Sequence, residues 1–213
     1  MSNTINKENY FISKFANSKF IGDDGAVVGK YVYSMDAFFE NVHFKTSWMS
    51  LKKIAMKSML VNISDAIVMN AVPKYALLSV AIPPHFTTDD LDKLSSGFKK
   101  VAEDYDITII GGDTISNNKL DISITIISET KKPIYRTGTK EGDFVCFTGE
   151  LGSVKKDLDK LLAGKKVKKA SKFIRPQLNA SFFYEISPYI NSALDISDGL
   201  FFELERLSKA NNI

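Results

Sequence analysis

The hydrophobic residues of this chain repeat with helical spacing most clearly between Lys57 and Pro73. One face of the predicted helix carries Met56, Met59, Leu60, Ile63 and Ile67, which recur every three or four positions. The opposite side is also apolar, because Val61, Val68 and Met69 fall there. A helix that is apolar nearly all round is typical of a buried helix. The pattern therefore predicts a central helix packed within the protein core.

Asp65 is the exception in this helix. An unpaired carboxylate in apolar surroundings costs several kcal/mol, roughly, so it requires a partner. No basic residue lies within one turn of Asp65. The partner must therefore come from another part of the fold or be a metal ion. The alternative is that Asp65 is a helix cap or a buried polar group with ordinary hydrogen bonds.

The remaining pattern predicts helices and strands without a strict alternation of the two, which favours an α+β fold with layers of helices on a mixed sheet. Predicted strands lie at 26–34 (interrupted by Gly29), 75–82, 106–110, 120–128, 144–148 and 192–195. Predicted helices lie at 4–17, at 87–104 after the cap Thr87, between 148 and 165, at 178–186 and from 197 onward. A polar stretch with glycine and proline at 131–142 predicts two domains, 1–136 and 137–213.

The composition argues against some classes of protein but does not indicate an activity. The 213 residues are 44% hydrophobic and carry a net charge of +3, which is too small to indicate a nucleic-acid partner. No apolar run approaches the ~18 residues that a membrane-spanning helix needs. The single cysteine, Cys146, falls in a predicted strand and is interpreted as a buried thiol, which predicts a reducing, cytoplasmic location.

Eight lysines gather in one part of the second half, and two interpretations stay open. They could bind an anion, or they could form a solvated helix face and loop whose leucines point inward; the second is preferred. These lysines are 155, 156, 160, 165, 166, 168, 169 and 172.

Aspartates supply the candidate chemistry. The phosphate-binding patterns GxxxxGK[ST] and GxGxxG are absent from the sequence, and two histidines are too few for a histidine-based zinc site. Acidic residues instead stand at strand ends, glycine turns and helix starts, where carboxylates suit Mg²⁺ and Mg²⁺ suits phosphoryl transfer. These candidates are Asp23, Asp24, Asp36, Asp65, Asp113, Asp195 and Asp198.

Eight segments, in order along nearly the whole chain, resemble the thiamine-monophosphate kinase family. It belongs to the superfamily of aminoimidazole-ribonucleotide synthetase, selenophosphate synthetase and a hydrogenase-maturation protein. The segments are IGDDGAVV (21–28), SMDAFFENVHF (34–44), KSMLVNISDAIVMNAVP (57–73), IIGGDT (109–114), RTGTKEGD (136–143), TGELG (148–152), RPQ (175–177) and ALDISDGLFFEL (193–204).

The resemblance implies a fold and a reaction. The fold is an N-terminal α/β domain that dimerises through its sheet, with a C-terminal α/β domain over the nucleotide. The reaction is the ATP- and Mg²⁺-dependent phosphorylation of thiamine monophosphate to thiamine diphosphate by direct in-line transfer, without a covalent enzyme intermediate. The implied ligands of several Mg²⁺ ions are Asp24, Ser34, Met35 (through its backbone carbonyl), Asp36, Asp65, Asp113, Asp195 and Asp198.

The resemblance also implies contacts with the two substrates. ATP would meet Gly112, Asp113, Arg136 and Ser197, and His43 would touch thiamine monophosphate. For His43 the alternative is a packed histidine at a strand end. For Arg136 the alternative is an exposed cation in a linker.

This sequence departs from the family pattern in several places. Met35 replaces the usual threonine, and Asn41 and Asn70 replace glycines. The family's later Gly-Gly-Glu-Asp segment is not found, so the C-terminal domain is expected to be incomplete and the kinase activity of this chain low. Two alternatives to the kinase stay open: a related ATP-dependent enzyme of the superfamily, and a fragment that binds nucleotide without turnover.

Overall fold

A computed structural model describes residues 7–15 and 18–213 of the chain. Its centre is one mixed five-stranded sheet in the order β1-β2-β5-β3-β4. The strands are β1 (Ala26–Val28), β2 (Tyr31–Phe39), β3 (Val72–Ile82), β4 (Thr108–Ser116) and β5 (Asp121–Glu129). Only the β3–β4 pair is parallel among these neighbours. Together with its helices, this sheet confirms the α+β prediction.

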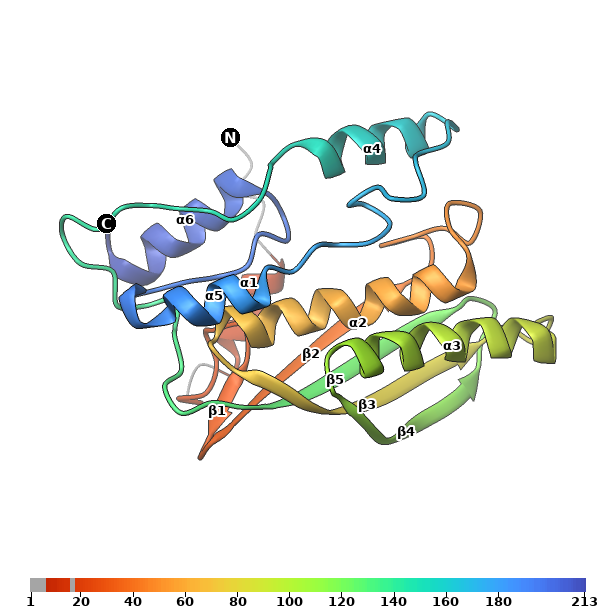
Figure 1. Ribbon diagram of the computed structural model, residues 1–213, viewed down its shortest axis with the longest axis horizontal. Helices are drawn as coiled ribbons and strands as arrows, with labels where there is room; N and C mark the ends of the chain where they lie inside the picture. The colour runs from red at the N-terminus through yellow and green to blue at the C-terminus, as the bar shows by residue number, and fades with distance from the viewer. Residues whose placement is uncertain (1–6, 16–17) are drawn as a thin grey trace.

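Two long helices, α2 (Leu51–Val68) and α3 (Thr88–Asp104), cover one face of the sheet (Figure 1). Thr87 caps α3 as predicted, because its side chain and that of Asp90 exchange hydrogen bonds with each other's backbone. The two helices approach closely at Gly97, where an added Cβ would lie 2.2 Å from the carbonyl oxygen of Lys52. A glycine is therefore required at this crossing.

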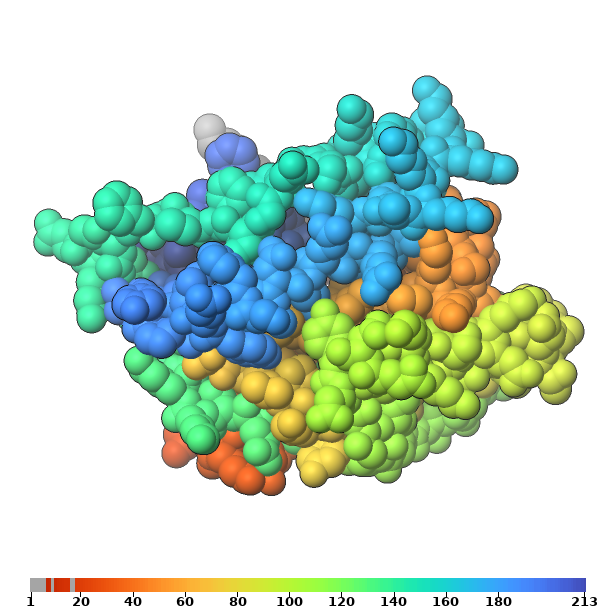
Figure 2. All heavy atoms as spheres, in the orientation of Figure 1, coloured from red at the N-terminus to blue at the C-terminus, as the bar shows by residue number. Residues whose placement is uncertain are grey.

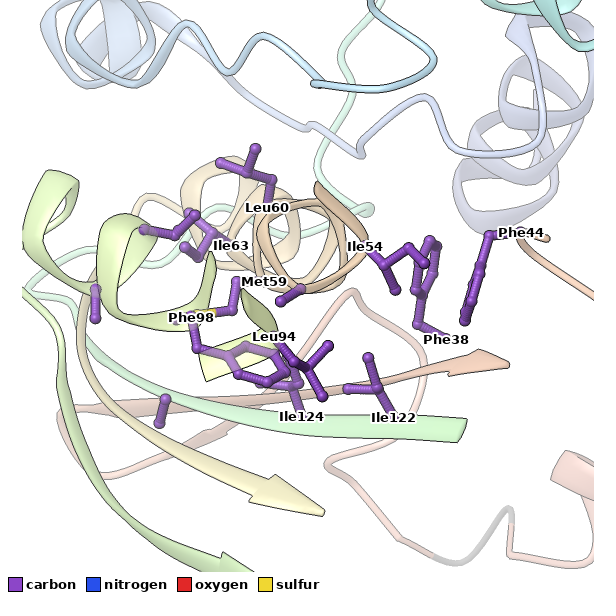
Figure 3. Packing of buried hydrophobic residues seen from close by; sticks show 14 of the residues in the cluster. Phe38, Phe44, Ile54, Met59, Leu60, Ile63, Leu94, Phe98, Ile122 and Ile124 are labelled. Atoms are coloured by element: carbon purple, nitrogen blue, oxygen red, sulfur yellow. The ribbon is translucent and has the colours of Figure 1, made fainter. Parts of the chain in front are cut away.

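The core lies between these helices and the sheet. Figure 3 shows Met59 of α2 beside Leu94 and Phe98 of α3, above Ile122 and Ile124 of β5. The interior face of α2 matches the predicted apolar face, and the helix begins six residues earlier than Lys57. Because α2 is covered by the sheet on one side and by the C-terminal part on the other, its nearly uniform apolarity is explained.

The second face of the sheet is open in the part of the chain that the structure describes (Figure 1). Side chains alternate along β2, so that Val32 and Phe38 are buried under the helices while Tyr33, Met35 and Phe39 are exposed on the open face. The name open face is used below for this exposed side of the sheet. The predicted dimerisation through the sheet stays a prediction at this point.

Residues after 131 pack on the side of α2 that faces away from the sheet (Figures 1 and 2). Leu161, Phe173 and Ile174 belong to the same buried cluster as the core of the sheet. The division at residue 136 stays a prediction, and the two parts share this apolar contact. The helices outside the sheet layer are α1 (Lys7–Ser13), α4 (Ser153–Leu162), α5 (Ala180–Ile186), α6 (Leu200–Asn211) and the 3₁₀ turn η1 (Ser187–Tyr189).

The predicted C-terminal strands 144–148 and 192–195 are wrong, since the structure has no strand in either segment. Phe144 is 93% exposed, and Cys146 is exposed rather than buried. A strand needs a neighbouring strand for a ladder of backbone hydrogen bonds, and among the described residues Ala193 makes only a single such bond, to the Tyr135 carbonyl at 3.0 Å. The helices predicted in this part are present.

Two other boundaries differ from the prediction. The strand predicted at 26–34 is a hairpin, because Gly29 adopts a φ of 63° and turns the chain between β1 and β2. The strand predicted at 106–110 continues through two glycines to Ser116. Of the helix predicted at 4–17, residues 7–13 form α1, while 4–6, 16 and 17 lie outside the described residues.

None of the helices in the described ranges has the length and hydropathy to cross a membrane.

Candidate metal and nucleotide site

Three carboxylates from distant parts of the chain meet beside the C-terminal half of α2. Asp24 lies in the turn before β1, Asp65 in α2, and Asp195 in the loop before α6. One oxygen from each lies within 4.8 Å of the other two. These three residues, with Asp36 of β2, are called the acid cluster below. The structure thus brings together four of the eight predicted metal ligands.

Burial raises the pKa values of all four carboxyl groups. Burial is the largest cause of the raised pKa of each group. For Asp36, Asp65 and Asp195 the second cause is the negative charge of another aspartate of the cluster. The pKa of Asp195 rises to about 7, and that of Asp65 rises far above its ordinary range. For Asp24 the neighbouring Arg136 opposes part of the increase in pKa. Buried like charges at this spacing favour the binding of cations.

Arg136 supplies positive charge to the acid cluster. Its guanidinium forms an ion pair with Asp24, whose side chain is only 3% exposed, and its backbone N–H donates to Asp23 Oδ1 over 2.7 Å. The buried Nε of Arg136 has no hydrogen-bond partner among the described residues. Arg136 is therefore a partly buried residue of the site, which contradicts the alternative of an exposed linker cation.

The donor set of the acid cluster fits Mg²⁺. All four donors are carboxylates, the hard oxygen ligands that Mg²⁺ selects, and Mg²⁺ uses only one or two of them per ion. One arginine balances a single carboxylate, so negative charge is left over for more than one divalent ion. A cation held here would be the partner that the sequence pattern requires for the partly buried Asp65.

Ser34 and Met35 are consecutive on β2 and lie on opposite faces of the sheet. The buried Ser34 hydroxyl donates a 2.6 Å hydrogen bond to Asn62 Oδ1 of α2. The Asn62 side-chain amide also donates to the Ile124 carbonyl, so this link holds α2 against the sheet. The Met35 side chain lies on the open face, and only its backbone could approach the acid cluster.

Gly112 and Asp113 lie apart from the acid cluster in this chain. Both are in β4, and β5 and β3 separate that strand from β2. Asp113 is exposed and pairs in register with Ser79 of β3. Gly112 packs so tightly on β3 that an added Cβ would lie 1.7 Å from the Leu78 carbonyl oxygen. The structure does not bring these two residues together with the other predicted ligands.

Ser197 and Asp198 border the acid cluster without joining it. The Asp198 carboxylate pairs with Arg206 at 2.9 Å, and the Ser197 hydroxyl lies 3.4 Å from a Glu203 oxygen. Glu203 is 3% exposed and contributes to the raised pKa values of Asp24 and Asp195. Glu203 could not be recognised as a site residue from the sequence, where its signal is a single charge in the apolar start of the last helix.

His43 lies just after β2 and stacks on Phe38, with ring centroids 5.6 Å apart. Its Nδ1 accepts the backbone N–H of Phe39 at 3.0 Å, so a neutral ring carries its proton on Nε2. Burial, followed by the charge of Lys57, lowers the pKa of His43. A neutral ring at a strand end can pack, as the alternative supposed, and also offer Nε2–H to a ligand.

Lys57 is a buried charged residue of α2 whose role is not evident from the sequence. It lies two turns before Asp65 on α2, about 12 Å along the helix. Its ammonium group lies 3.8 Å from the ring centroid of Phe173 and 5.7 Å from that of Phe38. Burial lowers the pKa of Lys57 to about 8. These cation–π contacts connect α2 to the C-terminal part.

Replacing Lys57 with methionine is expected to stabilise the protein at pH 7 by about 1 kcal/mol. Burying the charged amine costs roughly 3 kcal/mol for a pKa moved from 10.5 to about 8, and the cation–π contacts offset part of that cost. In the wild type the unfolded chain binds more protons between pH 8 and 10.5, so stability rises with pH in that window. Urea denaturation at pH 7 and pH 9.5 should show that the free energy of unfolding rises less between these two pH values in Lys57→Met than in the wild type.

The exposed Lys52 on the same helix provides the matched control. Lys52→Met should change neither the free energy of unfolding at pH 7 nor its rise between pH 7 and pH 9.5. A Lys57→Met variant that is less stable than wild type at both pH values would contradict the expectation.

Comparison with known proteins assigns the chain and its fold to a family. The sequence profile of the family "AIR synthase related protein, N-terminal domain" matches residues 22–130. The thiamine-monophosphate kinase of Aquifex aeolicus is 30% identical over 212 residues, covering 95% of this chain and 69% of the relative. That of Bacillus subtilis is 34% identical over 208 residues, covering 90% of this chain and 64% of the relative.

Similarity extends to three dimensions. A solved structure described as AaThiL complexed with AMPPCP and TMP superposes with a TM-score of 0.90 at 30% identity, covering 96% of this chain and 69% of that one. This chain therefore spans about two thirds of the length of these relatives.

Proposed function

Because this chain belongs to the thiamine-monophosphate kinase family, we propose that it catalyses the ATP-dependent phosphorylation of thiamine monophosphate to thiamine diphosphate. The related AaThiL forms a complex with AMPPCP and TMP. By the same proposal this chain takes ATP as its phosphoryl donor and thiamine monophosphate as its acceptor. The cytoplasmic location predicted from the sequence stays a prediction.

The acid cluster is the observation that carries the proposal. Asp24, Asp65 and Asp195 come from three separate segments, and all of them are held in a partly buried place. Their mutual repulsion has no structural benefit to the fold, since carboxylates with raised pKa values destabilise the folded state when they ionise. Such a cluster is therefore most consistent with a function in which bound cations neutralise the carboxylates.

Asp24, Asp36, Asp65 and Asp195 would hold Mg²⁺, while Ser34, the Met35 carbonyl, Asp113 and Asp198 are further ligands predicted by the resemblance. Bound Mg²⁺ would neutralise phosphate charge and orient the reacting groups. The chain's own contribution is to place these carboxylates and to keep them partly shielded from water. An oxygen of the acceptor phosphate would attack the γ-phosphorus in line, the bond from that phosphorus to the bridging oxygen would break, and ADP would leave, with no covalent intermediate on a side chain.

Arg136 and His43 are proposed to bind the substrates. Arg136 carries the permanent charge nearest the acid cluster, and a planar guanidinium suits phosphate oxygens. His43 is exposed just after β2, where its Nε2–H could donate a hydrogen bond to the substrate. Gly112, Asp113 and Ser197 remain proposed ATP contacts.

We further infer that the protein is a homodimer joined through the open face. Tyr33, Met35 and Ile115 make this side of the sheet apolar and exposed. Sheets with one uncovered apolar face are completed by a second layer, and an identical sheet can supply it with two-fold symmetry.

The proposed activity is tested by incubating the 213-residue chain with thiamine monophosphate, ATP and Mg²⁺ and measuring thiamine diphosphate by chromatography. Product is expected only when all three are present, with one ADP formed per thiamine diphosphate. Replacement of thiamine monophosphate by thiamine provides the acceptor control, since thiamine lacks the attacking phosphate.

Two other outcomes would support the alternatives. ATP binding without thiamine diphosphate would favour a nucleotide-binding chain without turnover. ATP consumption with another acceptor, and none with thiamine monophosphate, would favour a related enzyme of the superfamily.

A further inference from the structure

Helix α6 touches both sides of the acid cluster. Its first turn contacts the loop 195–199, which carries Asp195, and its last turn contacts the segment that carries Arg136. We propose that α6 is a positioning helix, and that Glu203 and Asn211 are the residues through which it sets the site. This inference rests on the proposed function, because it concerns the arrangement of that same site.

Glu203 is a buried residue of α6 that binds the loop 195–199. It is 3% exposed, and its Oε1 accepts the backbone N–H of Asp198 at 3.0 Å. The Arg206 guanidinium donates to both Glu203 oxygens, at 3.1 and 3.0 Å. Glu203 is therefore a buried carboxylate whose hydrogen bonds all lead to the loop or to its own helix.

Arg206 connects the same loop to α6 a second time. Its second terminal nitrogen lies 2.9 Å from the Asp198 carboxylate, and its guanidinium lies over the ring of Phe202. Both the backbone and the side chain of Asp198 are thus attached to the helix. Gly199, at a φ of 109°, makes the turn into α6 that this attachment needs. Asp195, three residues before Asp198, is then left facing Asp24 and Asp65.

Asn211 holds the segment on the other side. Its Oδ1 accepts the backbone N–H groups of Gly138 and Thr139 at 2.9 and 3.0 Å. Its side-chain amide donates to the carbonyls of Arg136 and Leu207, each at 2.8 Å. All the hydrogen-bonding positions of this amide are filled, which fixes its orientation.

One rigid element therefore connects the two segments between which the acid cluster is assembled. Glu203 and Asn211 are eight positions apart on the helix, about 12 Å along its axis. Because Arg136 pairs with Asp24, and Glu203 directs the loop of Asp195, a change in α6 would alter the spacing between Asp24 and Asp195. Residues that orient metal ligands in this way commonly affect metal affinity by about 10- to 100-fold.

The test replaces Glu203 with glutamine and measures two quantities. Calorimetric titration with Mn²⁺, used as the probe for a divalent site, should show an affinity about 10-fold or more below wild type. Amide hydrogen exchange should become faster at residues 196–199 and stay unchanged in β5. Glu205→Gln is the matched control, because Glu205 lies on the same helix, is exposed and, within residues 7–15 and 18–213, pairs with Lys209 alone.

The second measurement separates positioning from simple loss of charge. If Glu203→Gln weakens Mn²⁺ binding with unchanged exchange at 196–199, Glu203 acts through its charge alone and the inference is overturned. Equal effects of Glu203→Gln and Glu205→Gln would overturn it as well. If the wild type binds no Mn²⁺ while exchange at 196–199 responds as expected, the proposed function fails and the positioning contact stands.

Asn211→Ala keeps the inference testable if Glu203→Gln does not fold. This variant should accelerate exchange at Gly138 and Thr139 and weaken Mn²⁺ binding, without a change in β5. Unchanged exchange at both residues would show that Asn211 does not position the Arg136 segment.

Discussion

Replacing Asp65 with asparagine is expected to weaken Mg²⁺-dependent ATP binding by about 100-fold or more. Asp65 lies at the centre of the acid cluster, where its pKa is raised by burial and then by Asp36, Asp195 and Asp24. An amide cannot replace the charge of a carboxylate toward Mg²⁺. Loss of a ligand should exceed the 10- to 100-fold effect of losing a residue around a metal site. Titration calorimetry with ATP and Mg²⁺ measures the change directly.

The same variant should be more stable than wild type when no metal is present. With a raised pKa, the folded wild type binds more protons than the unfolded chain above pH 3.8, so its stability falls as pH rises toward neutrality. Asp65→Asn removes this loss. Thermal unfolding at pH 7.5 with a chelator should therefore give a higher midpoint for the variant, and added Mg²⁺ should raise the wild-type midpoint most.

Asp89→Asn is the matched control, because Asp89 is exposed on α3 and pairs with Lys93 far from the acid cluster. It should change neither ATP binding nor the response to Mg²⁺. If Asp65→Asn binds ATP as tightly as the wild type in the presence of Mg²⁺, Asp65 is not a metal ligand.

Replacing Met35 with lysine is expected to convert the proposed homodimer to monomer at micromolar concentration. Met35 is 69% exposed near the middle of β2, on the open face. A lysine there would bury an unpaired charge in an apolar interface, which costs several kcal/mol, roughly, and about 1.4 kcal/mol already changes a dissociation constant tenfold. Light scattering after size-exclusion chromatography measures the mass of both proteins.

Leu162→Lys is the control for this experiment, since Leu162 is similarly exposed at 62% but lies at the end of α4. It should leave the mass unchanged. A wild-type protein that is monomeric at micromolar concentration would disprove the dimer, and a dimeric Met35→Lys would show that the interface lies elsewhere.

Elements with strong local patterns were predicted well from the sequence. The apolar run around Ile63 is α2, the capped segment after Thr87 is α3, and the alternating residues at 120–128 are β5. Each of these patterns reports burial on one or more sides of an element, and that burial is present in the structure. Periodicity therefore sufficed where the partners of an element were available.

Elements that depend on a partner were predicted poorly. The segments 144–148 and 192–195 have the composition of strands, but no described strand lies beside them to form the hydrogen bonds. For the same reason Cys146 is exposed, because its predicted burial assumed a sheet around it. A sequence pattern reports a preference, and the neighbouring strand decides whether the preference is realised.

The sequence by itself determined which chemical groups are available: a carboxylate at Asp65 in an apolar helix that requires a partner, a set of further aspartates at turns and strand ends, and the motifs of its family. Only the tertiary structure decided which aspartates meet. It gathered Asp24, Asp36, Asp65 and Asp195, attached Asp198 to Arg206, and left Asp113 across the sheet. The physical reason is that charge and hydrophobicity belong to single residues, whereas the distances between carboxylates depend on how α2, the sheet and α6 pack together.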